Sequence, residues 1–450
     1  MAPLQQQGFD DRQTGLAGHS ASRWSVTCVA LLVLFSALMN YVGEHAWGFG
    51  PQTFILLLFL CALLLATPVI LRLLERIPFL RYRLPTPLLV GVFLLASTGL
   101  LGFHVREFVR GTSDPQVKDR LIDIGANTFY ANEIFFVHGR NPYTTRSQLA
   151  HDVAGGAHID TTGGVTTMYG IRYSYGYPYF PMMFASFAPF QMIVREYSAI
   201  RIGNLFFLLC TAAGVSWVTY RLSERSTRTL AATAGLALFL SATTLGSELM
   251  ILGVTDMVIA FFAVAGLVML TYRSFAAAGV AFGFALGCKL LPGALILIVV
   301  LVWLVMNRLH LGSFLTGLLV TAACLLLPFV LWDVQGFFSA TVLYYLTHHA
   351  TGDNTSLWYF LPEGLQTPFL IVGGVLILLA PVYQSRIKNH DLGFAITIAF
   401  VAYVLFVSFN KMTHLNYLWG VYPLGVISLV VQMSPDFLKP RRVVSLSDAP

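Results

Sequence analysis

The chain has 450 residues, of which 56% are hydrophobic and only 11% are charged, and its mean hydropathy is +0.72. Soluble domains carry about 25% charged residues, so this composition excludes a large soluble core and indicates a polytopic, all-α membrane protein. The net charge of +6 does not indicate nucleic-acid binding, because lysine and arginine gather in the cytoplasmic loops of membrane proteins. The five cysteines lack the paired spacing of zinc or redox sites.

The amino-terminal region consists of a polar tail followed by three apolar segments. Residues 1–23 are polar and are expected to form a disordered cytoplasmic tail. A spanning helix needs about 20 mostly apolar residues, which predicts a helix pair within residues 24–85 and a third span at residues 85–103. The connection before the third span is rich in arginine and should be cytoplasmic. The polar insert at residues 104–181 should then lie on the outer face, as a large first outer loop.

The next apolar segment, Phe180–Val194, is shorter than a usual span and contains two prolines. If it crossed the membrane, the arginines at 221, 225 and 228 would lie outside, against the positive-inside rule. We therefore expect a re-entrant or interfacial segment. Irregular backbone at membrane depth is tolerated only where it is buried in protein or lines a cavity, so this segment should form a wall of the site.

From Ser198 onward, apolar segments alternate regularly with polar or basic connections. They bring the total to about twelve spans, with both termini inside. Residues 332–366 should form a second outer loop, and residues 434–450 a cytoplasmic tail. No internal repeat is found, so residues 24–433 are expected to form one membrane domain.

This topology gathers many polar side chains at the outer membrane face. A charge in lipid costs a few kcal/mol, so their convergence favours a functional site. The alternative is that each side chain separately snorkels to the interface. The residues are Asp123, Asn127, Arg140, Tyr143, Arg172, Glu248, Asp256, Lys289, His348, His349, Asn354, Lys411, His414 and Asn416.

The carboxylates at this face have two interpretations each. Asp123 could accept the proton of an attacking hydroxyl, or it could cap a helix in the outer loop. Asp256 precedes an apolar segment, where a cap or first-turn acid is the ordinary role, and a supporting role in the site is the alternative. Glu248 lies near an outward helix end and is a candidate partner of Lys289 or Arg140.

The cations at this face indicate an anionic ligand. Lys289 lies alone between two apolar segments and requires a carboxylate or a phosphate. His348 and His349 are adjacent, and their side chains would diverge on a helix, which disfavours a shared metal. Either histidine could donate to a lipid phosphate, or both could be ordinary loop residues. Lys411 and His414 add a third cationic cluster, and such cations would stabilise the charge that develops on a phosphate leaving group.

Four groups of residues occur in a characteristic order along the chain. They are Asp123, Phe129 and Gly139–Tyr143 with Tyr175–Pro178; Gly279–Pro292; Tyr344–His349 with Asn354–Ser356 and Tyr359; and Phe409–Lys411 with Tyr417–Gly420 and Pro423. In this order they resemble the GT-C membrane glycosyltransferases, in particular the family 87 polyprenyl-phosphate-mannose-dependent transferases and the catalytic subunit of glycosylphosphatidylinositol mannosyltransferase I.

The resemblance implies a GT-C bundle whose cavity opens to the outer leaflet of the plasma or inner membrane. It implies that Asp123 is the catalytic base. The implied donor-phosphate or substrate contacts are Lys289, His348, His349, Lys411, His414, Arg140, Asn354, Tyr175 and Tyr177, with Glu248 and Asp256 as supporting candidates. The first two spans lie outside the resemblance.

The implied reaction moves a sugar, mannose by resemblance, from a polyprenyl-phosphate donor to a hydroxyl of a lipid or glycan acceptor, with inversion. No cofactor is expected. The eukaryotic subunit has Asp-x-Asp in this loop, whereas Gly125 occupies the second place here, so no metal site is predicted and divalent-metal dependence stays open. The alternative function is a membrane transporter or lipid flippase, which would predict an internal repeat and polar groups at mid-membrane depth.

Overall fold

The structure is a computed structural model that describes residues 24–45, 50–74, 76–80, 82–118, 121, 123–144, 158–159, 165–166, 172–173, 176–343, 357–386, 391–410 and 415–433. This part of the chain is a bundle of helices, as predicted. It also contains one small antiparallel sheet, which was not predicted. Its strands occur in the order β1 (His158–Ile159), β2 (Val165–Thr166) and β3 (Arg172–Tyr173).

Seven helices within the described residues are long and apolar enough to cross a membrane. They are α1 (Val26–His45), α2 (Gly50–Leu74), α3 (Thr86–Ser113), α7 (Ser198–Leu222), α13 (Leu311–Trp332), α16 (Glu363–Arg386) and α17 (Leu392–Phe409). The bent pair α8 (Arg228–Leu240) and α9 (Thr243–Ile251), with an angle of 54°, would be an eighth span. The shorter apolar helices include α10 (Met257–Thr271), α11 (Phe275–Leu286), α12 (Leu290–Met306) and α18 (Leu418–Gln432). Each predicted span coincides with a helix or a bent pair, and the count of twelve crossings stays a prediction.

The third span is longer than predicted, because α3 continues ten residues beyond residue 103, to Ser113. Two polar residues of this extension are buried and have partners on the α8–α9 pair. His104 Nε2 lies 2.8 Å from the carbonyl oxygen of Leu240. Ser247 Oγ donates a 2.9 Å hydrogen bond to Glu107. Residues that were assigned to the outer loop for their polarity therefore belong to a packed helix.

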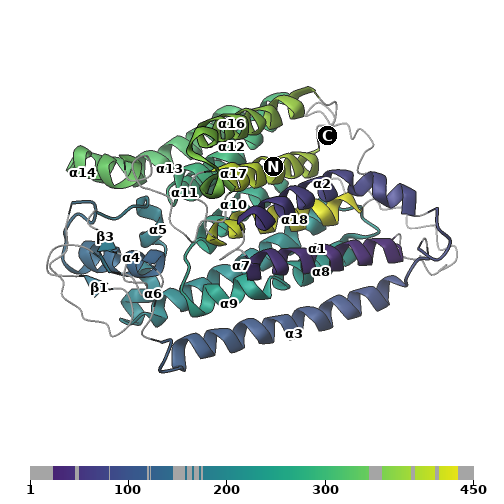
Figure 1. The fold of residues 1–450 in the computed structure, drawn as a ribbon, viewed down its shortest axis with the longest axis horizontal. Helices are drawn as coiled ribbons and strands as arrows, with labels where there is room; N and C mark the ends of the chain where they lie inside the picture. The colour runs from purple at the N-terminus through teal and green to yellow at the C-terminus, as the bar shows by residue number, and fades with distance from the viewer. Residues whose placement is uncertain are drawn as a thin grey trace, which may run out of the picture.

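The predicted outer insert contains short elements that gather at one end of the bundle (Figure 1). The predicted re-entrant segment is divided into two helices of five and six residues. A six-residue helix extends about 9 Å, far less than the roughly 30 Å hydrocarbon core, so neither crosses the membrane. Figure 1 shows α4 (Asp123–Asn132), α5 (Pro181–Ala185), α6 (Ala188–Ile193) and α14 (Val334–Phe338) at this end. The short helices η1 (Glu133–Val137) and η2 (Ser339–Leu343) directly follow α4 and α14, and the chain also contains η3 (Leu357–Phe360) and η4 (Leu415–Tyr417).

The carboxy-terminal helix α18 forms the centre of the bundle, and all of its residues are buried. It contacts α17, α8, α7 and α10 around it (Figure 1). The peripheral helices α3 and α16 instead expose large apolar side chains, such as Leu95 (76% exposed) and Leu378 (64%). Apolar exposure of this extent is expected on helices that face lipid.

Helices α11 and α13 pack unusually closely through glycines. A Cβ atom at Gly279 would collide with the carbonyl oxygen of Phe314, and one at Gly317 with that of Ala276. Small residues at such crossings let two helix backbones approach and pack well in a membrane. This packing fixes the end of α11, after which Lys289 follows.

Candidate functional site

A buried ion pair joins Lys289 to Asp256. Lys289 Nζ lies 2.6 Å from Asp256 Oδ1, and the two side chains are only 6% and 2% exposed. Asn416 Nδ2 donates a 2.7 Å hydrogen bond to the other oxygen, Asp256 Oδ2. Burial of two charges is costly unless they are paired and their remaining polar atoms are satisfied, and both carboxylate oxygens have donors here. The start of α10, the α11–α12 break and the segment before α18 therefore meet at one cluster, which we call the Asp256 cluster (Asp256, Lys289 and Asn416).

Two tyrosines enclose the ammonium group of this cluster. Lys289 Nζ lies 4.9 Å from the ring centroid of Tyr179 and 4.7 Å from that of Tyr417. An ammonium within about 6 Å of an aromatic face is attracted by the ring quadrupole, and the attraction strengthens when water is excluded. The rings therefore help to keep Lys289 charged inside the bundle.

The break between α11 and α12 is fastened to the segment that carries Tyr179. Phe180 N donates to the carbonyl oxygen of Cys288 at 3.1 Å, and Met182 N donates to that of Gly287 at 2.8 Å. Carbonyl groups at a helix end have no intrahelical partner. Here the carbonyl groups of residues 287 and 288 accept hydrogen bonds from residues 182 and 180, which are about a hundred positions away in sequence. Tyr179 is thereby placed over the lysine.

Asp256 occupies the position that the sequence favours for a helix cap, but it does not act as one. It is the N-cap residue of α10, yet its carboxylate accepts no capping hydrogen bond from that helix. Both of its oxygens are directed to Lys289 and Asn416 instead. Asp256 therefore stands at the N-cap position but forms no capping hydrogen bond, and the alternative, a supporting role in the site, stays a prediction.

Helix α4, which Asp123 begins, packs against the chain just before Asp256. A Cβ atom at Gly125 would collide with the carbonyl oxygen of Gly253. Gly253 has a positive φ of 71° and lies three residues before Asp256. No aspartate fits at Gly125 without moving α4, which gives a physical reason for the missing second acid of Asp-x-Asp. The side chain of Asp123 lies outside the described part of the structure.

Tyr177 connects α4 to the same region. Its hydroxyl lies 3.2 Å from the hydroxyl of Thr128 on α4, and its backbone N–H donates to the carbonyl oxygen of Pro142 at 3.0 Å. Burial raises the pKa of Tyr177 well above its usual value; the hydrogen bond to Thr128 opposes this shift, and nearby Asp256 adds to it. Tyr177 therefore stays neutral, as a hydrogen-bonding group in the wall of the site.

Arg201 is a buried cation that the sequence analysis missed. It is 0% exposed and lies on α7, within a segment that was predicted only as an apolar span. Its guanidinium donates to the carbonyl oxygens of Lys118 (2.9 Å), Val117 (3.0 Å), Met250 (2.9 Å) and Ile251 (2.9 Å). A charged residue inside a predicted span was the available signal. Arg201 ties the segment that leads to α4 to the end of α9.

The structure places the remaining predicted residues as follows. Arg140 is exposed on the turn after η1, and Glu248 is partly buried on α9. Lys289 forms an ion pair with Asp256; Glu248 was one candidate partner, for Lys289 or Arg140. Within the described ranges, no three His, Cys, Asp or Glu residues lie together as a metal site. Six predicted residues fall outside those ranges: Tyr175, His348, His349, Asn354, Lys411 and His414.

Comparison with known proteins gives one family match. The model described as Glycosyltransferase family 87 matches residues 177–421, a little more than half of the chain. The matched region includes the whole Asp256 cluster but begins after Asp123. Among curated proteins, none matches the chain significantly. A solved structure, ArnT from Cupriavidus metallidurans bound to undecaprenyl phosphate, is similar at 16% identity and a TM-score of 0.40, over 76% of this chain and 59% of that one. This chain thus covers less than two thirds of that protein's length.

Proposed function

The chain belongs to glycosyltransferase family 87, and we propose that it transfers mannose from a polyprenyl-phosphate donor to a hydroxyl of a lipid or glycan acceptor at the outer membrane face. The observation that carries this proposal is the Asp256 cluster, a buried ion pair within the matched region. The three residues come from distant parts of the chain and meet where α10, α11, α12 and α18 begin or end. Helix α4, which begins with Asp123, docks three residues before Asp256.

In this proposal Lys289 contacts the donor phosphate, and Asp256 keeps the ammonium charged and in place. The charge of Lys289 is already balanced by Asp256, so this pair alone offers a phosphate no net positive charge. Further cations are therefore required, and His348, His349, Lys411 and His414 are the candidates from the sequence. Preorganised positive groups of this kind stabilise the charge that develops on the leaving phosphate.

The proposed reaction is a single displacement with inversion. The acceptor hydroxyl oxygen forms a bond to the anomeric carbon on the face opposite the phosphate. The bond from that carbon to the phosphate oxygen breaks, and polyprenyl phosphate leaves with the electron pair. Asp123 accepts the hydroxyl proton as general base, a role worth about 10²- to 10⁴-fold in rate.

The remaining residues position these groups. Arg201 holds the carbonyl groups of residues 117 and 118, which precede α4, and the close contact between Gly125 and Gly253 packs α4 itself. Tyr179 and Tyr417 cover the ammonium and exclude water from it. Exclusion of water strengthens the electrostatic interactions on which the transfer depends.

The test is a transfer assay with the purified chain, radiolabelled polyprenyl-phosphate mannose and a membrane lipid extract. Covalent transfer of the label to a new lipid or glycan product is expected. In a parallel arm, the chain is reconstituted in vesicles with the same donor. Label that enters the vesicles and stays on the original donor would instead identify a transporter or flippase.

A further inference from the structure

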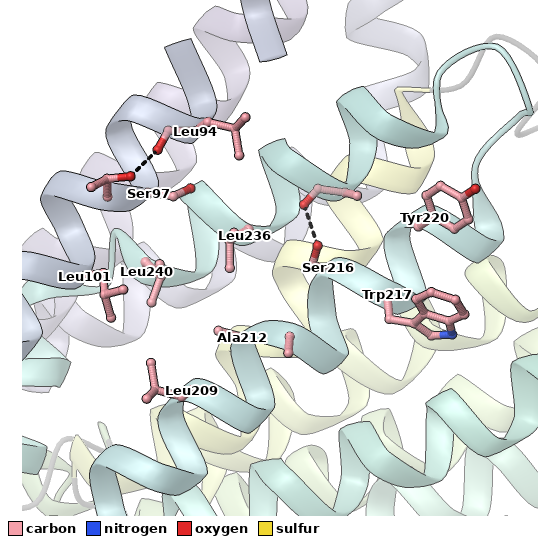
Figure 2. Close-up of a pocket in the computed structure, with 13 residues that line it drawn as sticks. Leu94, Ser97, Leu101, Leu209, Ala212, Ser216, Trp217, Tyr220, Leu236 and Leu240 are labelled. Carbon is pink, nitrogen blue, oxygen red and sulfur yellow. Dashed lines mark hydrogen bonds between the residues drawn. The ribbon is translucent and has the colours of Figure 1, made fainter. Parts of the chain in front are cut away.

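An apolar groove opens between α3, α7 and α8, on a part of the bundle that the proposed reaction does not use (Figure 2). Its volume is about 520 Å³, within the roughly 300–1,000 Å³ of small-molecule sites. One end is lined by Leu101, Leu209 and Leu240, and the other by Trp217 and Tyr220. The groove therefore has an aliphatic end and an aromatic end.

The groove exists because small side chains occupy its middle, namely Ser97, Thr98, Ala212, Ala213, Ser216 and Ala232. The three hydroxyls among them donate to backbone carbonyl oxygens of Phe93 (2.7 Å), Leu94 (3.0 Å) and Ala232 (3.0 Å). Their hydrogen-bond donors are thus used by backbone carbonyl groups, within α3 for Ser97 and Thr98 and between α7 and α8 for Ser216. The lining is effectively apolar and suits a hydrocarbon chain better than water.

The length of the groove matches one membrane leaflet. From Leu209 to Tyr220 the helix advances eleven residues, which is about 16 Å at 1.5 Å per residue. One leaflet contributes about half of the roughly 30 Å hydrocarbon core. A single acyl chain that enters at the aromatic end would therefore fill the groove to its aliphatic end.

The aromatic end is bordered by two arginines. Trp217 stacks on Tyr220 and on Tyr272, each with ring centroids 5.7 Å apart. The guanidinium of Arg221 lies 5.2 Å from the Tyr272 ring, and that of Arg228 lies 5.6 Å from the Tyr220 ring. In the part of the chain that the structure describes, neither arginine forms an ion pair. Trp, Tyr and Arg together are typical of a membrane interface where lipid head groups lie.

We propose that this groove binds an acyl chain of an anionic diacyl phospholipid whose phosphate lies on Arg221 and Arg228. Charge complementarity selects an anionic head group over a zwitterionic one, and the apolar lining binds the chain. The alternative occupant with the same phosphate chemistry is the polyprenyl-phosphate donor itself. Arg221 lies twenty residues beyond Arg201 on α7, so these two positions are about 30 Å apart along the helix axis. That distance equals the thickness of the hydrocarbon core of a membrane. A donor phosphate at Arg221 would be remote from the Asp256 cluster, which favours a structural phospholipid of the opposite leaflet.

The experiment measures lipid retention by native mass spectrometry on the purified full chain. Phosphatidylglycerol and phosphatidylcholine with matched acyl chains are added in separate arms, and undecaprenyl phosphate in a third. The wild type is expected to retain phosphatidylglycerol preferentially. The double variant Arg221→Gln/Arg228→Gln should lose this preference, by about fivefold for each arginine. Arg308→Gln, an exposed arginine on the turn between α12 and α13, is the matched control and should retain it.

A second variant, Leu236→Trp, fills the groove and leaves both arginines in place. It should lower retention of phosphatidylglycerol while the melting temperature and elution volume stay near those of the wild type. Ala213→Leu is used if the larger residue prevents folding. Equal retention of the two phospholipids, or retention that neither the arginine nor the groove variants change, would overturn the proposal. Displacement of phosphatidylglycerol by equimolar undecaprenyl phosphate would also overturn it, since the donor would then be the occupant. Because the readout is binding, failure of this site would not affect the proposed transfer reaction.

Discussion

Lys289 and Asp256 form a 2.6 Å ion pair inside the bundle although they are 33 residues apart in sequence. The pair joins the start of α10 to the break between α11 and α12, and Asn416 extends it to the segment before α18. Each charge is buried almost completely, so each depends on the other to stay ionised. The pair therefore has two separable roles, one in stability and one in binding a donor phosphate.

Replacement of Asp256 by Asn should strongly destabilise the protein. The change leaves the ammonium of Lys289 buried without a counter-charge, which costs about 3–5 kcal/mol. Lys289→Met should destabilise it for the converse reason, by leaving a buried carboxylate. The double variant Asp256→Asn/Lys289→Met removes both charges and should be more stable than the sum of the single losses predicts. Thermal unfolding in detergent measures all three.

The same variants separate stability from function. If Lys289 contacts the donor phosphate, the double variant should recover stability but still transfer no sugar. Additive stability losses would show that the two residues are not coupled in the protein. Wild-type transfer by the double variant would remove Lys289 from the proposed site and leave the pair as a purely structural contact.

Replacement of Gly125 by Ala should displace α4, because the new Cβ atom would collide with the carbonyl oxygen of Gly253. Overpacking of this kind costs about 1–3 kcal/mol, and movement of the helix that begins with Asp123 should lower the transfer rate further. Gly99→Ala is the matched control, since no atom lies within 4 Å of the added Cβ. That variant should be neutral or stabilised by up to about 1 kcal/mol through helix propensity. A Gly125→Ala protein with unchanged rate and stability would contradict the close approach.

The sequence predicted the helices well because apolar runs of spanning length carry a strong signal. It predicted their ends less well, since ends depend on partners elsewhere in the chain. Helix α3 continues through His104 and Glu107 because the carbonyl of Leu240 and the hydroxyl of Ser247 satisfy them. Such contacts join residues more than a hundred positions apart and cannot be read from a local pattern.

The sequence predicted that Lys289 needs an anion beside it, but it did not identify Asp256 as that anion. A lone lysine between apolar segments required an anion, and the sequence left carboxylate and phosphate open. For Asp256 a cap or first-turn acid was the favoured interpretation, with a supporting role in the site as the alternative, because Gly-Val-Thr-Asp before an apolar run is typical of a helix start. In the structure the carboxylate of Asp256 pairs with Lys289 and does not cap α10. Arg201 was missed because hydrophobic neighbours on α7 mask a single charge in a composition window.

Replacement of Arg201 by Lys should destabilise the end of the bundle where α4 packs. A single ammonium cannot reproduce the forked guanidinium that reaches four carbonyl oxygens, and each lost bond from a charged donor costs about 1.5–3 kcal/mol. Hydrogen exchange should increase in the segments around residues 117 and 250, before it does elsewhere. Arg195→Lys, at an exposed arginine near the start of α7, is the control and should match the wild type. Unchanged exchange in Arg201→Lys would mean that the two segments are held together by packing alone.

Replacement of Asp123 by Asn tests the proposed base directly. The amide has nearly the same size but cannot accept the hydroxyl proton, so the transfer rate should fall by about 10²- to 10⁴-fold. Donor binding and melting temperature should change little, because the proposed role is confined to the reacting proton. Asp114→Asn is the matched control: Asp114 lies just after α3 in the same insert, and its carboxylate accepts a 2.9 Å hydrogen bond from Gln116 N. That variant should keep the wild-type rate. If Asp123→Asn transfers mannose at the wild-type rate while Asp256→Asn/Lys289→Met does not, the base must be sought elsewhere in the insert, and the family assignment would still stand.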